Sequence, residues 1–348
     1  MNFQKLETLC RICGTSGREN DVRTYILNEI QALGLTPKVD ALGNIIVRKN
    51  GKMRANHTLM LSAHMDEVAL MVTDICSDGS LKIDMVGGIS AAAVIGRQVV
   101  VGKQKINGVI GTAPVHHLSA DAKKSPAKMS ELTVDIGAKN RDEAMQYVKR
   151  GDIVYFSPKY DVFGDGSIAA KAVDDRFGCA LLLELLRSDL PFEYDTDFAF
   201  VVQEEVGLRG AGVAANQISP EFALIFEATT AADVAGCHGA DAVCKLGGGA
   251  VISFMDGRTV YDAELYDTAV RIAEDAGISW QTKTKIAGGN DAGAIQNAAN
   301  GVRVLAISVP CRYLHSPVCV IRESDAIACE NLAKALIPAI QQLGDANE

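Results

Sequence analysis

Hydrophobic residues along this chain recur with two different periods, and the changes of period divide it into helices and strands. In residues 16–33, apolar side chains recur every three or four positions until Gly34, which is the pattern of an amphipathic helix. Ser16 and Glu19 stand at the spacing of a capping box, so we expect the start of this helix there.

Several short runs are almost entirely apolar, which predicts strands buried in a sheet. Two longer segments show helical spacing instead. The alternation of the two patterns predicts an α/β fold, a phosphorylase/hydrolase-like mixed sheet flanked by helices. The predicted strands are 44–47, 58–63, 197–203, 221–226 and 303–310, and the further predicted helices are 172–187 and 259–277.

Residues 75–158 differ from their surroundings, because short Val- and Ile-rich runs are separated there by Gly and Asp-Gly turns. Runs such as DGSLKIDMVGG and GDIVYFSP predict a small all-β module. Since α/β patterns lie on both sides, we expect the module to be inserted into the α/β domain. The predicted organisation is an α/β catalytic domain of residues 1–70 and 160–348 and an inserted β-rich domain of residues 71–159.

Composition narrows the classes of partner. The 348 residues carry a formal net charge of -9, which disfavours nucleic acid, and no apolar run approaches the ~18 residues of a membrane span. Nine cysteines, an odd number, in a chain without an export signal predict a reducing compartment, the cytoplasm. Cys10 and Cys13 form a CxxC with no second pair at zinc spacing, so we interpret them as buried thiols.

Acidic and histidine residues stand at the ends of the predicted elements. His64 and Asp66 lie two apart after strand 58–63, so their side chains project to the same side. The pair fits either a metal-binding histidine with an orienting carboxylate or a merely polar strand end. Asp174 and Asp175 begin helix 172–187, where carboxylates either stabilise the helix dipole or bridge cations.

Acidic and histidine residues also follow the later predicted strands. Glu204 and Glu205 point in different directions, so one can hold a metal ion while the other takes a proton from water. Glu227 and His315 follow two further strands. Active sites of open α/β sheets lie at the carboxyl ends of the strands, and histidines with carboxylates suit Zn²⁺, Co²⁺ or Mn²⁺. The whole set therefore predicts a metal site.

Six sequence blocks carry these residues through nearly the whole chain: SAHMDEVALMV, KAVDDRFGCALLLELL, VVQEEVGLRGA, AADVAG, AGGNDAGAIQ and RYLHSPVCVI. In order and spacing they resemble the tetrahedral, TET-type, di-metal aminopeptidases, the family of glutamyl and deblocking aminopeptidases. The resemblance implies that the inserted β-rich module mediates dimerisation and that twelve chains assemble from dimers into a hollow tetrahedron.

The resemblance also implies two divalent metal ions per chain and a role for each residue. A water activated by both ions would attack the first peptide bond of short peptides. Asp291 follows a Gly-rich turn and fits both helix capping and a place in the cleft. The implied roles are a bridging carboxylate, Asp174; ligands of one ion, His64 and Glu227; ligands of the other, Glu205 and His315; the general base, Glu204; a carboxylate orienting His64, Asp66; and substrate contacts, Asn290 and Asp291.

Two positions depart from the family pattern. Glu227 stands where the family usually has Asp, so its carboxylate reaches further by one methylene, and Asn290 replaces the Thr of a GGTDAGAI-like block. Two alternatives use the same residues or the same fold: a related two-metal amidase, such as a carboxypeptidase or deacylase, and a non-catalytic shell protein. Cleavage that requires a free α-amine would distinguish an aminopeptidase from the amidase. About two bound metal ions per chain would distinguish an enzyme from the shell protein. The preferred N-terminal residue stays open.

Overall fold

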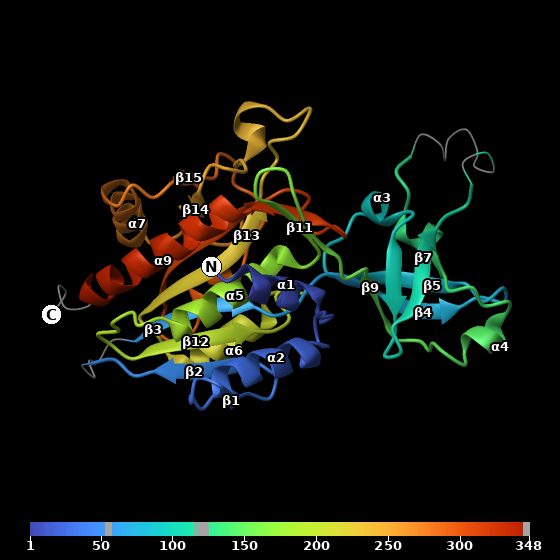
Figure 1. Cartoon of the computed structure of the whole chain (residues 1–348), viewed down its shortest axis with the longest axis horizontal. Helices are drawn as coiled ribbons and strands as arrows, with labels where there is room; N and C mark the ends of the chain where they lie inside the picture. The colour runs from blue at the N-terminus through green and yellow to red at the C-terminus, as the bar shows by residue number, and fades with distance from the viewer. Residues whose placement is uncertain (53–57, 115, 117–124, 344–348) are drawn as a thin grey trace.

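The computed structural model describes residues 1–52, 58–114, 116 and 125–343. Within these ranges an eight-stranded mixed sheet forms the larger unit, and a closed barrel forms a smaller unit beside it (Figure 1). The sheet has the order β1-β2-β12-β3-β13-β16-β14-β15. Its strands are β1 (Lys38–Val39), β2 (Ile45–Lys49), β3 (Leu59–His64), β12 (Thr196–Val201), β13 (Phe222–Thr230), β14 (Ala250–Ile252), β15 (Trp280–Thr282) and β16 (Arg303–Cys311).

The centre of the sheet is parallel, since β3 pairs in parallel with β12 and β13, and β13 pairs in parallel with β16. Every residue of β3 and β12 is buried, which explains why their sequences read as unbroken apolar runs. Helices α5 and α9 pack on this sheet together, and α6 and α8 form a second packed pair on it. The predicted fold class is confirmed.

Three helices of the larger unit, α2, α5 and α7, agree with the predicted segments to within a few residues, whereas α1, α6, α8 and α9 were not among the predicted helices. None of the described helices is long and apolar enough to cross a membrane. The bounds are α1 (Phe3–Arg11), α2 (Asn20–Gln31), α5 (Val173–Arg187), α6 (Arg209–Ile218), η4 (Gly239–Ala242), α7 (Ala263–Asp275), α8 (Ala292–Ile295) and α9 (Glu323–Leu343).

The capping box predicted for α2 is wrong. The helix begins at Asn20, and Glu19 makes no side-chain cap hydrogen bond; its carboxylate accepts from the Gly17 N–H at 2.7 Å instead. Ser16 lies outside the helix, and its hydroxyl bonds to Asp66, 50 residues away. The Ser16 side chain is therefore held by a tertiary contact with Asp66 and does not cap the helix.

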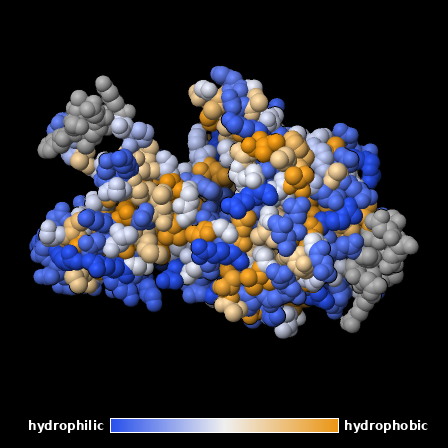
Figure 2. Space-filling model, turned by 180° about the vertical axis from the view of Figure 1, so that it is seen from behind, coloured by the Kyte–Doolittle hydropathy of each residue, from blue (hydrophilic) through white to orange (hydrophobic). Residues whose placement is uncertain are grey.

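The smaller unit is a closed barrel of strand order β4-β5-β8-β7-β6-β9 with a hydrophobic core of its own. It occupies residues 69–156 of the chain, and the two units meet at a narrower waist where Figure 2 shows hydrophobic residues at the surface. The barrel elements are β4 (Ala69–Ile75), β5 (Leu81–Val86), α3 (Ala91–Val94), β6 (Gln98–Val101), β7 (Ile106–Gly111), η3 (Met129–Glu131), β8 (Thr133–Asp135), α4 (Arg141–Ala144) and β9 (Ile153–Phe156).

A three-stranded sheet follows the barrel in the chain. Its order is β10-β11-β17, and β17 leads into the C-terminal helix α9, whose end lies far from the barrel (Figure 1). The strands are β10 (Tyr160–Phe163), β11 (Ser167–Ala170) and β17 (Cys319–Arg322). Because β17 comes directly after the loop that carries His315, this small sheet fixes the far end of that loop.

Candidate metal centre

The parallel strands bring the predicted site residues to one edge of the sheet, because their carboxyl ends all point the same way. The residues come from five different parts of the chain. They are His64 at the end of β3, Glu204 and Glu205 after β12, Glu227 in β13, His315 after β16 and Asp174 in the first turn of α5.

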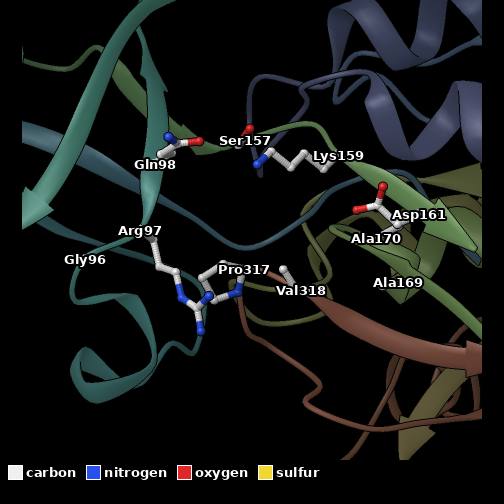
Figure 3. Close-up of a pocket in the computed structure, with 10 residues that line it drawn as sticks. All are labelled: Gly96, Arg97, Gln98, Ser157, Lys159, Asp161, Ala169, Ala170, Pro317 and Val318. Carbon is white, nitrogen blue, oxygen red and sulfur yellow. The ribbon is translucent and has the colours of Figure 1, made fainter. Parts of the chain in front are cut away.

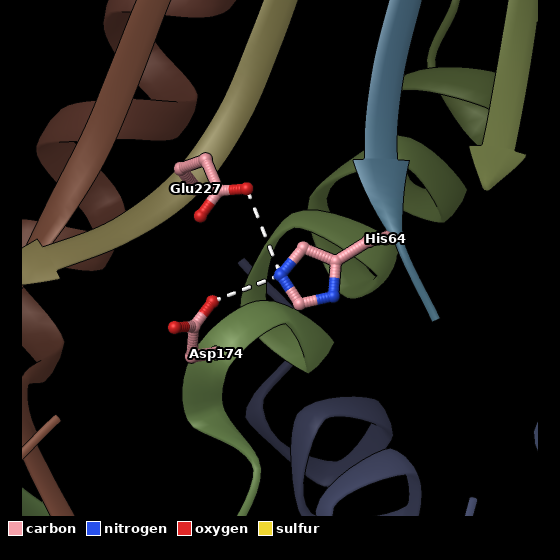
Figure 4. Close-up of side chains that lie close together, drawn as sticks. All are labelled: His64, Asp174 and Glu227. Carbon is pink, nitrogen blue, oxygen red and sulfur yellow. Dashed lines mark hydrogen bonds and ion pairs between the residues drawn. The ribbon is translucent and has the colours of Figure 1, made fainter. Parts of the chain in front are cut away.

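His64, Asp174 and Glu227 form the first buried group (Figure 4). The Nε2 atom of His64 lies 3.1 Å from Asp174 Oδ1 and 3.6 Å from Glu227 Oε1. All three side chains point toward a common centre between β3, β13 and α5. The longer glutamate at position 227 therefore reaches the group in spite of its departure from the family pattern.

Asp174, Glu205 and His315 form the second group. The Nε2 atom of His315 lies 3.4 Å from Asp174 Oδ2 and 3.4 Å from Glu205 Oε2. Asp174 belongs to both groups, with one carboxylate oxygen facing each histidine. Glu204 lies at the boundary, 4.0 Å from His64 Nε2.

Asp174 and Asp175 divide between them the two roles that the sequence allows. Asp175 Oδ1 accepts the Gly178 N–H at 2.9 Å, and Asp175 Oδ2 accepts the His64 N–H at 3.2 Å. The Asp175 carboxylate therefore accepts hydrogen bonds from the backbone of α5 and β3, while the Asp174 carboxylate faces the two histidines. A Cβ at position 178 would lie 2.4 Å from the Asp175 carboxylate, so only glycine permits this approach.

Asp66 supports the backbone beneath the second pair of carboxylates. Its Oδ1 accepts the Glu204 N–H at 3.0 Å, and its Oδ2 accepts the Glu205 N–H at 3.2 Å and the Ser16 hydroxyl at 2.6 Å. The His64 ring is held mainly by the Asp66 backbone, since Nδ1 lies 3.0 Å from the carbonyl oxygen and 3.5 Å from the carboxylate. The sequence predicted a capping role for Ser16 and did not indicate this contact with Asp66.

A buried ion cluster on the other side of the same segment was also missed. Glu67 accepts from Lys171 Nζ at 2.8 Å and lies 3.3 Å from Arg176. The Arg176 guanidinium also donates to three carbonyls of the N-terminal segment, those of residues 9, 12 and 14. The three charged side chains are at most 2% exposed. This cluster clamps the N-terminal segment to the strand that ends in His64.

The charges of the site are strongly coupled. Burial raises the pKa of Glu204 to about 7, and the charge of Asp174 adds to this. Burial, reinforced by Asp174, also raises the pKa values of Glu205 and Glu227 well above their usual range. Burial acts in the opposite sense on the histidines, but the carboxylates outweigh it and raise the pKa of His315 to about 9.

The residues present fit divalent cations. Glu205 Oε1 and Glu227 Oε1 are buried and make no hydrogen bond in the described part of the chain. Such orphaned acceptors are costly unless a cation or a proton satisfies them. Carboxylate oxygens and imidazole nitrogens without a thiolate are the donor set that Zn²⁺, Co²⁺ and Mn²⁺ share.

Comparison with known proteins identifies the group to which this geometry belongs. The family described as M42 glutamyl aminopeptidase matches residues 43–332. This chain belongs to that family. The fold and the order of the sequence blocks agree with the predicted TET-type resemblance, so the aminopeptidase prediction is confirmed and the shell-protein and amidase alternatives are not favoured.

Three similar proteins place this M42 aminopeptidase among its relatives. The glutamyl aminopeptidase of Lactococcus lactis is 32% identical over 97% of this chain and 96% of its own. The lysyl aminopeptidase of Pyrococcus furiosus is 30% identical over 99% of each chain. The TET1 peptidase of Pyrococcus horikoshii, described as assembling into a tetrahedron or a large octahedral shell, is 36% identical with a TM-score of 0.84, over 96% of this chain and 98% of its own.

The aminopeptidase has a cleft of about 300 Å³ over the candidate metal centre, lined by Asp174, Glu204, Glu227 and His315 among others. The barrel reaches the edge of the centre, since a Cβ at Gly88 would lie 3.4 Å from the His315 ring. A second hollow, of about 350 Å³, lies at the waist between the units (Figure 3). It is lined by Arg97 and Lys159, and it contains none of the predicted site residues.

The two predicted substrate contacts differ in their surroundings. Asn290 lines the cleft, and its amide is hydrogen bonded to the Tyr261 hydroxyl at 3.1 Å. The capping role predicted for Asp291 is wrong, because Asn290 Oδ1 accepts the Ala292 N–H at 2.9 Å instead. Asp291 is 1% exposed, and neither of its carboxylate oxygens has a hydrogen bond within the described residues. Burial, with Glu204 nearby, raises its pKa well above the usual range.

Proposed function

We propose that this aminopeptidase holds two divalent cations, Zn²⁺, Co²⁺ or Mn²⁺, and removes N-terminal residues from short peptides. His64 and Glu227 would bind one ion, Glu205 and His315 the other, and Asp174 both. The supporting observation is that the two Asp174 oxygens face different histidines, at 3.1 Å and 3.4 Å. A carboxylate in this position suits two ions better than one.

The ions and the protein contribute different parts of the chemistry. A pair of divalent cations supplies a water of lowered pKa and polarises the substrate carbonyl. Glu204 lines the cleft beside them and is largely buried, and in the metal-free site burial raises its pKa to about 7. A carboxylate in this position can take a proton from water and pass it to the leaving amine. We therefore assign Glu204 as the general base.

Asp66 acts on this base through the backbone. Its carboxylate accepts the N–H groups of both Glu204 and Glu205, so it fixes the direction in which each side chain leaves the chain. We propose that Asp66 positions the base and one metal ligand together, as well as holding the His64 ring. Asn290, on the cleft wall, is the better placed of the two predicted substrate contacts.

The experiment replaces Glu204 by Gln and measures metal content together with turnover. We expect two metal equivalents per chain in both proteins and a loss of turnover of roughly 10²–10⁴-fold in the variant. Glu274→Gln, on the exposed face of α7, is the matched control and should leave both quantities unchanged. Unchanged turnover in Glu204→Gln would remove its role as base, and one metal equivalent would remove the two-ion centre.

The requirement for a free N-terminus is tested with amino-acid anilides. An aminopeptidase should cleave anilides with a free α-amine and ignore their acetylated forms. Cleavage of both forms would favour the related two-metal amidases. This test does not depend on which amino acid the enzyme prefers, provided that several side chains are compared.

We further propose that the barrel mediates dimerisation and that dimers assemble into a tetrahedral dodecamer in the cytoplasm. Two strands of the barrel expose large apolar side chains, Met85 of β5 at 46% and Val109 of β7 at 45%, which suits a contact between chains. All nine cysteines are free thiols, as a reducing compartment requires. Light scattering of the purified protein should give a mass close to twelve chains, and a monomer would contradict the proposed assembly.

A further inference from the structure

The hollow at the waist between the two units carries positive charge, although the chain as a whole is negative. Its lining includes Arg97, at the end of the segment that joins β5 to β6, and Lys159, between β9 and β10. Among the described residues of the lining, Asp161 carries the one opposing charge. Two cations and one carboxylate give the hollow a net charge of +1, against -9 for the whole chain, so it attracts carboxylates.

The two cations face the gap between the units. Figure 3 shows Arg97 extending from the barrel side and Lys159 extending toward the barrel from the other side. Arg97 Nε donates to the Ala93 carbonyl at 3.4 Å, and within the described ranges no carboxylate forms an ion pair with Arg97 or Lys159. Both residues are exposed, so each can bind an anionic ligand from solution.

Two segments of the chain run from the candidate metal centre to this hollow. In the loop after β16, His315 faces the centre, and Pro317, two residues further on, lines the hollow. In the segment between β5 and β6, a Cβ at Gly88 would lie 3.4 Å from the His315 ring, while Arg97 at the other end of the segment lines the hollow. The hollow therefore adjoins the side of the centre to which His315 belongs.

Backbone hydrogen bonds connect the parts of the hollow. The Ser157 N–H donates to the Gln98 carbonyl at 3.2 Å, which joins the segment before Lys159 to the barrel strand β6. Ala170 of β11, which also lines the hollow, pairs with Cys319 of β17, at the end of the loop that carries His315. The hollow is therefore fixed to the barrel on one side and to this loop on the other.

The position of the hollow suits the far end of a short peptide. An aminopeptidase binds one residue before the scissile bond and all the others after it, so the chain beyond the first residue must leave the cleft. The Cα atom of Pro317 is at most about 7 Å from that of His315, and each residue of an extended peptide adds about 3.3–3.6 Å. The C-terminal carboxylate of a peptide of three or four residues thus comes within reach of the two cations.

We infer that the waist hollow is a subsite in which Arg97 and Lys159 bind the C-terminal carboxylate of tripeptides and tetrapeptides. The inference rests on the proposed aminopeptidase function and adds the class of peptide that the enzyme takes. The N-terminus of such a peptide lies over the metal centre and its C-terminus lies at the waist. A peptide with an amidated C-terminus loses the second of these contacts.

The test uses peptides that begin with the residue preferred among the anilides and continue with one to three alanines, each prepared as the free acid and as the C-terminal amide. The measured quantity is the acid-to-amide ratio of kcat/KM for release of the first residue. One exposed charge pair contributes about two- to fivefold, and two contribute about 4- to 25-fold. We therefore expect the ratio for three and four residues to exceed that for two residues by roughly 4- to 25-fold.

Arg97→Gln and Lys159→Met should each lower this excess by about two- to fivefold and together remove it, while cleavage of the amides stays unchanged. Lys103→Met is the matched control, because Lys103 is exposed in the turn between β6 and β7 and does not line the hollow. It should keep the wild-type ratio at every length.

The outcomes separate the subsite from the enzyme activity. A wild-type ratio that is the same at all three lengths overturns this inference alone, because cleavage of the amides still demonstrates an aminopeptidase. An excess that survives in the double variant overturns the assignment of the carboxylate to the hollow, and so does a double variant that loses acid and amide cleavage equally. Failure to cleave any of the peptides overturns the proposed function itself.

Discussion

Removing the metal ions should make the stability of this enzyme fall as the pH rises. In the metal-free site, burial raises the pKa of Glu204 from 4.5 to about 7. Between these two pH values the folded protein keeps a proton that the unfolded chain has released. Stability falls with pH wherever the folded state binds more protons, so folding is most favourable below pH 4.5 and weakens up to about pH 7.

The size of the effect follows from the same shift. One pKa unit corresponds to about 1.4 kcal/mol, so Glu204 alone accounts for a loss of about 3 kcal/mol between pH 4.5 and 7. His315 acts in the same direction at higher pH, because its pKa is raised from 6.5 to about 9, and its contribution is present below pH 6.5 and lost through pH 9. A typical domain has a total stability of about 5–15 kcal/mol, so the loss should be readily measured.

The assay is urea unfolding at pH 5, 6, 7 and 8, at one protein concentration, with EDTA and with metal restored. The stripped enzyme should lose stability across this range. The loaded enzyme should not, since bound cations replace the protons and bind more tightly as the ligands deprotonate. Glu204→Gln should flatten the curve of the stripped enzyme by about 3 kcal/mol. A stripped wild-type enzyme that is as stable at pH 8 as at pH 5 would refute the reasoning.

Three substitutions test the surroundings of the site by urea unfolding or metal competition. Glu67→Gln leaves the two buried cations Lys171 and Arg176 uncompensated and should lower the free energy of unfolding by about 3–5 kcal/mol. Its control, Asp275→Asn, breaks an exposed ion pair and should lower it by at most about 1 kcal/mol. Equal losses in the two variants would contradict the buried clamp. Ser16→Ala removes a hydrogen bond to the buried Asp66 carboxylate and should lower the free energy of unfolding by about 1.5–3 kcal/mol. Ser16→Thr keeps the hydroxyl and should restore this stability. An unchanged urea midpoint in Ser16→Ala would contradict the role of this hydrogen bond. Glu227→Asp withdraws an oxygen now 3.6 Å from the His64 ring, so competition with a chelator should show one ion bound at least about tenfold more weakly.

The sheet and most of the centre could be predicted from the sequence for one physical reason. Parallel strands buried on both faces have unbroken apolar runs, and the polar residue that ends each run lies at the active-site edge. His64 at the end of β3 and Glu204 after β12 were located in this way. Glu227 lies inside β13, which continues for three more residues. The change from apolar to acidic residues therefore located Glu227 correctly, but it did not mark the end of the strand.

The features that were missed depend on contacts between distant parts of the chain. Ser16 stands at capping-box spacing, and only the fold shows that Asp66 takes its hydroxyl. Lys171 is 1% exposed, although an unpaired lysine is rarely buried, and only the fold shows its partner Glu67. Lys283 follows a short edge strand and is typical of a solvated loop, and only the fold shows that it lines the cleft. Local patterns carry none of this information.

Asp66 and Glu67 explain why the N-terminal segment belongs to the catalytic unit. The two residues are consecutive after β3, so their side chains leave on different sides of the chain. Asp66 holds the backbone of Glu204 and Glu205, and Glu67 binds the cations that clamp residues 9–14. Ser16 joins the two sides, because it follows the clamped residues 9–14 closely in the chain and donates a hydrogen bond to Asp66. A change in the N-terminal segment should therefore alter the placement of the base, and with it kcat, without touching the substrate.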